Sequence, residues 1–105
     1  DVEAAADCYA AQAVIWHNTD GLETTREENM ATLRNFIRFV PSRRYEDRRV
    51  QAFPGGFVQQ HRLTGTLANG KAVEMTACIV CAVSQGKITR LDEYFDSATL
   101  AAWTK

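Results

Sequence analysis

The sequence predicts an α+β fold in which helices lie on one face of a curved antiparallel sheet. The first observation is the stretch 71–96, where two long apolar runs flank a short polar turn at 84–87. Two strands joined by so short a turn pair antiparallel. The second observation is Asn69-Gly70, a strong hairpin signal that joins the same central strand to the one before it. The third is the order of elements: helix, strand, helix, four antiparallel strands and a final helical turn.

The N-terminal part of the chain contains a helix and a short strand. Residues 1–11 are rich in alanine and other good helix formers, which predicts a helix. Residues 13–17 (AVIWH) are β-branched or aromatic, which predicts a strand. The polar residues 18–21 then predict a turn.

A second helix is predicted by its start and stop signals. Thr24 with Glu27, or Thr25 with Glu28, matches a capping box. An apolar stripe at helical spacing follows, and Pro41 ends the helix.

The rest of the chain predicts four strands and a closing helix. The strands are 43–53, 57–67, 71–83 and 87–95, and Asp96 or Ser97 caps a helix that runs to about residue 103. The first strand (RRYEDRRVQAF) carries four arginines, which would suit phosphate binding. Acidic and aromatic residues lie between them, so we favour a solvated strand with cross-strand ion pairs.

Length and composition predict one soluble domain over residues 1–105. The net charge of -1 and the pI near 6.1 argue against nucleic acid as the main partner. No apolar run is long enough for a membrane helix, and no signal peptide is visible, so we expect no membrane partner. The chain does not begin with Met, so we expect a fragment or a processed chain.

The cysteines predict neither a disulfide framework nor a metal site. Their number, three, is odd, and a reducing cytoplasm suits them best. Cys78 and Cys81 form a CxxC pattern, but residues three apart on a strand point to opposite faces. We therefore read them as small buried residues and expect no metal and no cofactor.

Three sequence motifs resemble a known superfamily. They are 13–18 (AVIWHN), 65–70 (GTLANG) and 86–96 (GKITRLDEYFD). With them the whole chain resembles the nuclear transport factor 2-like superfamily, in its SnoaL-like branch, which is related in fold to ketosteroid isomerase and limonene epoxide hydrolase. The resemblance implies a cone-shaped fold whose helices close a pocket against the concave sheet. It also implies dimers formed through the sheet, and a longer N-terminal helical segment that this chain lacks.

The resemblance to limonene epoxide hydrolase implies specific site residues. The two catalytic carboxylates of that enzyme fall on Glu74 and Glu93 of this sequence. Its water-holding Tyr and Asn fall on Trp16 and Asn18, so Trp replaces Tyr. Its bridging Arg falls near Ala72 and is missing.

Strand alternation gives the same two carboxylates a place in a pocket wall. One row of the central strand holds Glu74, Thr76, Cys78 and Val80, and one row of the next holds Thr89, Leu91, Glu93 and Phe95. Each row is largely apolar and broken by one carboxylate, the setting of a general acid or base. We predict Glu93 and Glu74 as catalytic residues, with Thr76, Cys78 and Leu91 binding substrate. The alternative for Glu74 is an ion pair with an arginine at the sheet rim.

Three further residues complete the candidate site. His61, in the middle of a strand, is predicted to relay protons, the alternative being a structural role. Trp16 is predicted to point inward and bind substrate, which sends His17 to the opposite face. Asn18 is predicted to bind substrate or, alternatively, to form a turn.

Two functions remain open at this point. The first is a cofactor-independent isomerase, cyclase or epoxide hydrolase that acts on a small, largely apolar molecule with pocket carboxylates. The second is a non-catalytic binding protein for a small hydrophobic ligand.

The second face of the central strand predicts a homodimer. Its row is apolar throughout: Val73, Met75, Ala77, Ile79 and Cys81. If the helices cover the other row, this one needs a partner chain. We expect Ile79 and Met75 near the centre of the interface and Tyr94 at its edge.

Overall fold

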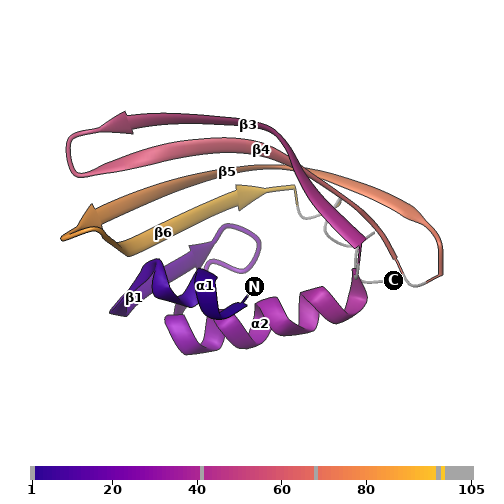
Figure 1. The fold of residues 1–105 in the computed structure, drawn as a ribbon, viewed down its shortest axis with the longest axis horizontal. Helices are drawn as coiled ribbons and strands as arrows, with labels where there is room; N and C mark the ends of the chain where they lie inside the picture. Colours follow the sequence, from indigo (N-terminus) through magenta and orange to yellow (C-terminus); the bar gives the residue numbers. More distant parts are fainter. Residues whose placement is uncertain (1, 41, 68, 97, 99–105) are drawn as a thin grey trace.

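The computed structural model describes residues 2–40, 42–67, 69–96 and 98, which form one six-stranded sheet with helices on one side. The elements in chain order are α1 (Val2–Asp7), β1 (Tyr9–His17), β2 (Glu23–Thr25), α2 (Arg26–Phe39), β3 (Ser42–Phe53), β4 (Gly56–Thr66), β5 (Ala72–Ser84) and β6 (Lys87–Phe95). The strand order across the sheet is β2-β1-β6-β5-β4-β3. The sheet curves over α1 and α2, which lie on its concave side (Figure 1).

The predicted meander is confirmed, with β3, β4, β5 and β6 each antiparallel to the next. One part of the prediction is wrong, because the sheet is mixed: β1 pairs with β6 in parallel, with Ile15 opposite Leu91 and His17 opposite Glu93. These two strands are separated by most of the chain, so no hairpin turn fixes their relative direction. β1 also begins earlier than expected, at Tyr9, and the short β2 pairs antiparallel along its other edge.

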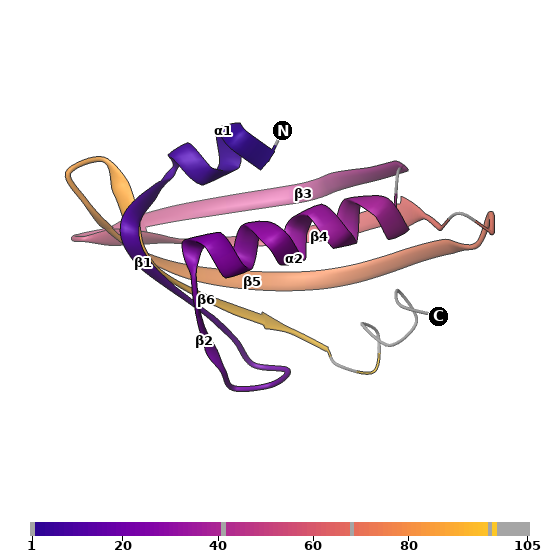
Figure 2. The same cartoon turned by 90° about the horizontal axis from the view of Figure 1, so that it is seen from below.

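Helix α2 follows from its cap. Thr25 is the N-cap: its hydroxyl accepts from the Glu28 backbone N–H, and the Glu28 carboxylate accepts from the Thr25 N–H. Of the two capping boxes that the sequence allowed, this is the one that forms. The helix lies lengthwise beneath the central strands (Figure 2).

The central strand β5 turns its apolar row toward the helices. Met75, Ala77 and Cys81 are buried, whereas Glu74 and Thr76 are exposed. The prediction had the two rows reversed. Burying the apolar row under α2 removes more apolar surface from water than burying a row with a carboxylate, and this decides which face is inside.

Two clusters of buried residues form the core beneath the sheet. One contains Val40, Leu63, Leu67, Val73 and Met75, with Phe36 and Phe95 packed against it. The other contains Ala13, Ile15, Cys81 and Leu91, with Tyr9, Phe57, Ile79 and Ile88 packed against it.

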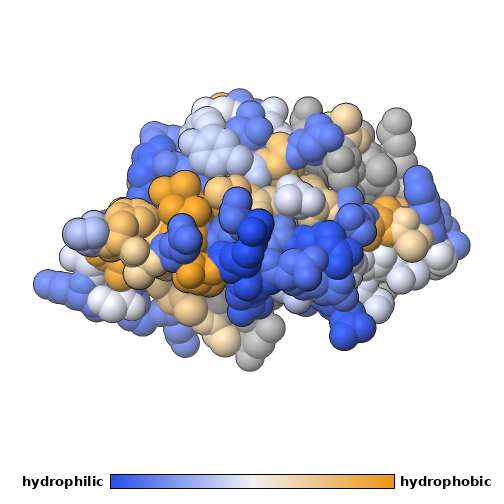
Figure 3. Space-filling view, turned by 90° about the horizontal axis from the view of Figure 1, so that it is seen from above, coloured by the Kyte–Doolittle hydropathy of each residue, from blue (hydrophilic) through white to orange (hydrophobic). Residues whose placement is uncertain are grey.

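The outer, convex face of the sheet carries the cross-strand ion pairs predicted for the arginine-rich strand. Arg62 contacts three carboxylates, those of Glu46 at 2.8 Å, Asp47 at 3.0 Å and Glu74 at 3.0 Å. Figure 3 shows this face, where charged and apolar side chains gather in separate areas. Ion pairs this exposed contribute little to stability.

Among the described residues, no helix is long and apolar enough to cross a membrane. The predicted closing helix falls almost wholly outside the described residues. At its expected start, Asp96 Oδ1 accepts a hydrogen bond from the Ala98 backbone N–H at 3.0 Å.

Candidate functional site

A cavity of about 570 Å³ lies between the concave face of the sheet and helix α2, where the two core clusters meet. Its size is that of a site for a small organic molecule. The apolar part of its lining comes from both clusters, and polar side chains reach it from five elements. The polar lining residues are Tyr9 and His17 from β1, Asn29 and Thr32 from α2, Tyr45 and Arg48 from β3, Gln59 and His61 from β4, and Glu93 from β6.

His17 and Glu93 form a hydrogen-bonded ion pair in this cavity. The parallel register of β1 and β6 sets the two residues side by side on the concave face. His17 Nε2 lies 3.1 Å from Glu93 Oε1, and the side chains are only 20% and 25% exposed. The hydrogen bond to Glu93 raises the pKa of His17, and burial opposes this with a smaller effect. The pair therefore favours an imidazolium beside a carboxylate.

His61 lies across the cavity and is held neutral. Its side chain is 6% exposed, and burial, the largest cause, lowers its pKa. The Gln59 amide nitrogen lies 3.0 Å from His61 Nδ1. An amide nitrogen can only donate, so in this orientation Nδ1 accepts and the ring proton is on Nε2. His61 is thus a neutral N–H donor fixed by Gln59 and by edge-to-face contact with Tyr45 at 5.2 Å.

The sheet register sets the spacing between these groups. Glu93 is opposite Ile79, and Ile79 is opposite Gln59, so Glu93 and His61 are two strands apart and two residues out of line. Strand geometry puts their Cα atoms roughly 12 Å apart. With both side chains on the concave face, the gap between them has room for about one ring of a ligand.

Two tyrosines add phenolic donors to the cavity wall. Burial is the largest cause that raises the pKa of Tyr9, to about 12. Burial is also the largest cause that raises the pKa of Tyr45. Both phenols stay protonated at neutral pH and can donate to an oxygen of a ligand.

Three of the predicted site residues lie at the cavity: Glu93, His61 and Leu91. Their proposed roles stay predictions, but all three line the cavity, as the sequence analysis expected. Glu93 and Leu91 are two residues apart on β6, and His61 reaches the cavity from β4.

Four residues predicted to line the site lie instead on the outer face of the sheet, opposite the cavity. Thr76 and Cys78 border a separate shallow hollow on the outer face together with Tyr94. Glu74 contacts Arg62 there, which was the alternative considered for it. Trp16 packs edge-to-face on Tyr94, with ring centroids 5.2 Å apart. Strand alternation explains all four, because each is one residue away from a concave-face neighbour.

Asn18 has a structural place at the end of β1. Its side-chain nitrogen donates to the Phe95 carbonyl at 3.1 Å, and its oxygen accepts from the Phe95 N–H at 3.0 Å. Its own backbone N–H donates to the Glu93 carbonyl at 3.0 Å. Asn18 thus extends the β1–β6 pairing and holds the Glu93 backbone in place. It does not line the cavity.

The sequence analysis missed His17, Gln59, Tyr45 and Arg48. The signal for His17 was available: it is two residues after Ile15, the most apolar residue of its strand, and so shares its face. The resemblance aligned Trp16 with a water-holding residue and so predicted it to point inward, which reversed the two faces of this strand.

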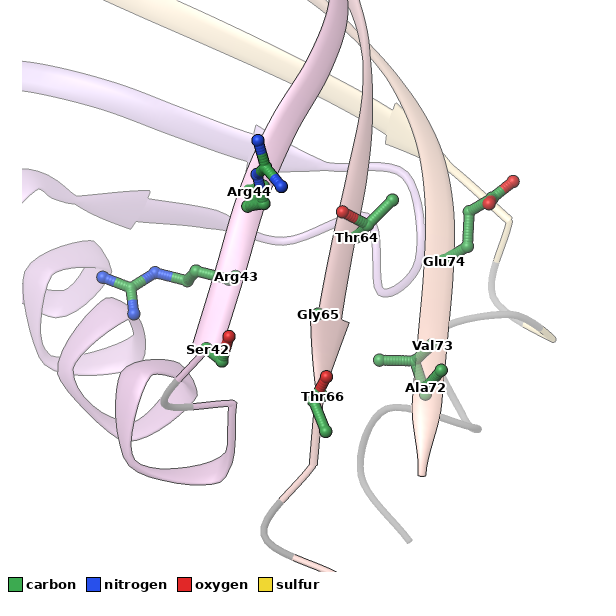
Figure 4. Close-up of a pocket in the computed structure, with 9 residues that line it drawn as sticks. All are labelled: Ser42, Arg43, Arg44, Thr64, Gly65, Thr66, Ala72, Val73 and Glu74. Carbon is green, nitrogen blue, oxygen red and sulfur yellow. The ribbon is translucent and has the colours of Figure 1, made fainter. Parts of the chain in front are cut away.

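Two other hollows offer fewer groups suited to acid–base chemistry. One, of about 490 Å³, lies at the far end of β3, β4 and β5, where Arg43 points toward α2 while Arg44 and Glu74 point elsewhere (Figure 4). Its one carboxylate, Glu74, is engaged by Arg62. No group of three or more His, Cys, Asp or Glu within the described ranges has the arrangement of a metal site.

The sequence profile of the SnoaL-like domain matches residues 1–91. The chain belongs to the SnoaL-like domain family. A search of curated proteins finds no match.

Solved structures share the fold of this SnoaL-like domain at low sequence identity. A nuclear transport factor 2-like protein of unknown function from Burkholderia pseudomallei is 15% identical, with a TM-score of 0.83, over 98% of this chain and 84% of that one. A provisionally named polyketide cyclase from Xanthomonas campestris pv. campestris is 18% identical, with a TM-score of 0.83, over 100% and 85%. A provisionally named isomerase from Bacillus subtilis is 10% identical, with a TM-score of 0.84, over 99% and 81%. The predicted nuclear transport factor 2-like α+β fold is therefore confirmed.

Proposed function

We propose that this SnoaL-like domain is a cofactor-independent acid–base enzyme, an isomerase or cyclase acting on a small, largely apolar carbonyl compound. The observation that carries the proposal is the Glu93–His17 pair, which faces a neutral, N–H-donating His61 across a cavity whose remaining lining is largely apolar. Two titratable groups held in different protonation states on either side of one cavity are the usual equipment for proton transfer.

Glu93 is the proposed base. One of its oxygens accepts from His17, and the second has free lone pairs with which to take a proton from the carbon next to the substrate carbonyl. The C–H bond breaks, its electron pair moves into the C–C bond, and the carbonyl π electrons move to oxygen to give an enolate. His17 holds the carboxylate oriented throughout.

His61 and a tyrosine are the proposed stabilisers of the enolate oxygen. The His61 Nε2–H and the Tyr45 hydroxyl can both donate to a ligand oxygen in the cavity, where it is lined by β3 and β4. In an isomerisation the proton returns from Glu93 to a different carbon. In a cyclisation the enolate carbon instead attacks a second carbonyl carbon, and the new alkoxide takes the proton from Glu93.

The structural relatives give limited support to this reaction class. Two of them carry the provisional names polyketide cyclase and isomerase, and the proton removal proposed here could begin either a cyclisation or an isomerisation. The epoxide hydrolase reaction has less support, because a paired-carboxylate mechanism would need Glu74 on the same face as Glu93, and it lies on the other.

Deuterium exchange tests the proposal without knowledge of the natural substrate. Wild-type protein in D₂O should speed the exchange of the α-hydrogens of 2-tetralone, an apolar enolisable ketone, above the buffer rate. Glu93→Gln should lower that enzymatic rate by about 10²–10⁴-fold, the usual worth of a general base. The matched control is Asp92→Asn, the adjacent carboxylate on the outer face, which should keep the rate. No exchange above buffer with wild-type protein would overturn the proposal.

A non-catalytic binding protein is the second candidate. It is favoured by the engagement of Glu93 with His17, which uses part of the acceptor capacity of the only carboxylate lining the cavity among the described residues. Binding of 2-tetralone seen by calorimetry, together with no exchange, would select this candidate.

Two further properties are proposed with the function. The homodimer would use the outer face of the sheet, since Ile79 and Met75 line the cavity and cannot also meet a partner chain. A cytoplasmic location is supported by Cys8, Cys78 and Cys81, which are all free thiols.

A further inference from the structure

A β-bulge on the edge strand β3 turns Arg48 into the cavity. Glu46 is opposite Arg62 on β4 and Arg49 is opposite Gln60, so Asp47 and Arg48 together face the single residue His61. Asp47 takes a left-handed backbone conformation with φ of 54°, the conformation of the first residue in G1-type bulges. With regular alternation Asp47 would have faced the helices. The bulge instead sends Asp47 to Arg62 on the outer face and Arg48 to the cavity.

Arg48 is the only arginine or lysine among the described residues that line the cavity. The central carbon of its guanidinium lies 5.9 Å from the centre of the Tyr45 ring, a cation–π contact. It forms no ion pair within the part of the chain that the structure describes. The neighbouring carboxylates, Glu46 and Asp47, are both held by Arg62 on the other face.

The positive charge of Arg48 affects the pKa values of residues that line the cavity. Burial is the largest cause that lowers the pKa of His61, and Arg48 adds a smaller effect in the same direction. Burial raises the pKa of Tyr45, and Arg48 opposes this with a smaller effect. A cation without a carboxylate partner, at the edge of an apolar cavity, is well suited to an anion that a ligand brings with it.

The distance across the sheet sets the size of such a ligand. Glu93 on β6 and Arg48 on β3 are separated by β5 and β4 and are two residues out of line, so their backbones are roughly 16 Å apart. Both side chains reach into the cavity and shorten that gap. A planar system of one or two rings would extend from the His17–Glu93 pair to the guanidinium.

We propose that Arg48 binds an anionic oxygen group, a carboxylate or an ionised phenol, at the far end of a planar apolar ligand from Glu93. This inference rests on the proposed function for the position of the reacting carbon, and it adds the substrate class. The site takes ring compounds that carry an acidic group in preference to neutral ones of the same shape.

Matched pairs of small probes test the preference by calorimetry at about pH 8, where a His61 with a lowered pKa is neutral. Naphthalene-2-carboxylate is compared with naphthalene-2-carboxamide, and 4-nitrophenolate with 4-nitroanisole. Wild-type protein should bind at least one anion about tenfold more tightly than its neutral partner, and the pair that shows this identifies the acidic group. Arg48→Gln should remove the preference. Arg49→Gln, the matched control on the outer face, should keep it.

The outcomes separate the two proposals. Binding of the neutral probes reports on the cavity alone, so equal binding of charged and neutral probes by wild type overturns the role of Arg48 and leaves the acid–base function standing. A preference that survives Arg48→Gln also overturns it. If no probe binds at millimolar concentration, the cavity is not a ligand site, and the inference and the proposed function both fail.

Discussion

The pKa of each of the two histidines, His17 and His61, is shifted by its surroundings in the cavity. His17 has a carboxylate at 3.1 Å that raises its pKa. His61 has an amide donor on Nδ1 and an arginine nearby, and burial lowers its pKa. Sequence alone selected His61 but placed His17 on the opposite face. It could assign neither charge, because Glu93 and Arg48 come from other strands than the histidines they act on, and Gln59, two residues before His61 on the same strand, showed no sign of its contact with the ring.

A proton NMR titration should therefore separate the two imidazoles. His17 should titrate above the ordinary value of about 6.5, and His61 below it. In Glu93→Gln the midpoint of His17 should fall, because the hydrogen bond that raises it is weakened while the opposing effect of burial remains. Asp92→Asn should leave the His17 midpoint in place. Two midpoints that coincide in wild type would contradict the description of the site.

At the scale of elements, local sequence signals predicted well which segments form helices and which form strands. The Asn-Gly turn at 69–70, the 84–87 turn and the capping box predicted three strands and helix α2 close to their observed bounds. These signals did not predict which face of each strand is buried. Alternation divides β5 into two rows without saying which is inside, since that depends on where α2 lies. The parallel β1–β6 pair and the bulge at Asp47 depend on contacts distant in sequence, and neither leaves a local pattern.

The capping box on α2 makes a stability prediction at this scale. Thr25→Ala removes the acceptor for the Glu28 N–H and should lower the free energy of unfolding by about 1 kcal/mol. Thr25→Ser keeps an acceptor oxygen and should retain most of the stability. Urea denaturation of the three proteins measures the difference. An alanine variant as stable as wild type would show that the cap contributes nothing.

At the scale of the whole molecule, the two faces of the sheet differ in the side chains they carry. The concave face holds the cavity under α2, and the convex face holds ion pairs beside an apolar area (Figure 3). Tyr94 on the convex face is 44% exposed, and Val80 lies on the same face of the sheet, opposite Val58 and Asp92. This second face is the one free for the proposed homodimer.

Neighbouring residues on opposite faces of β5 test the proposed dimer. Val80→Asp should convert the dimer to monomers, because it adds a charge to the apolar part of the outer face. Ile79→Ala, one residue away but facing the cavity, should keep the dimer and weaken ligand binding instead. Sedimentation velocity at micromolar concentration distinguishes them. A wild-type protein that sediments as a monomer would refute the dimer.

The central claim is that the chemistry belongs to the concave face, at Glu93, and not to the face that carries Glu74. The most direct measurement is deuterium exchange into 2-tetralone by Glu93→Gln and Glu74→Gln, each purified beside wild type and matched for folded fraction by circular dichroism. Glu93→Gln should lose about 10²–10⁴-fold of the enzymatic rate. Glu74→Gln should exchange at close to the wild-type rate, because Glu74 is 60% exposed and contacts Arg62 on the outer face. Loss of exchange in Glu74→Gln with retention in Glu93→Gln would contradict the account.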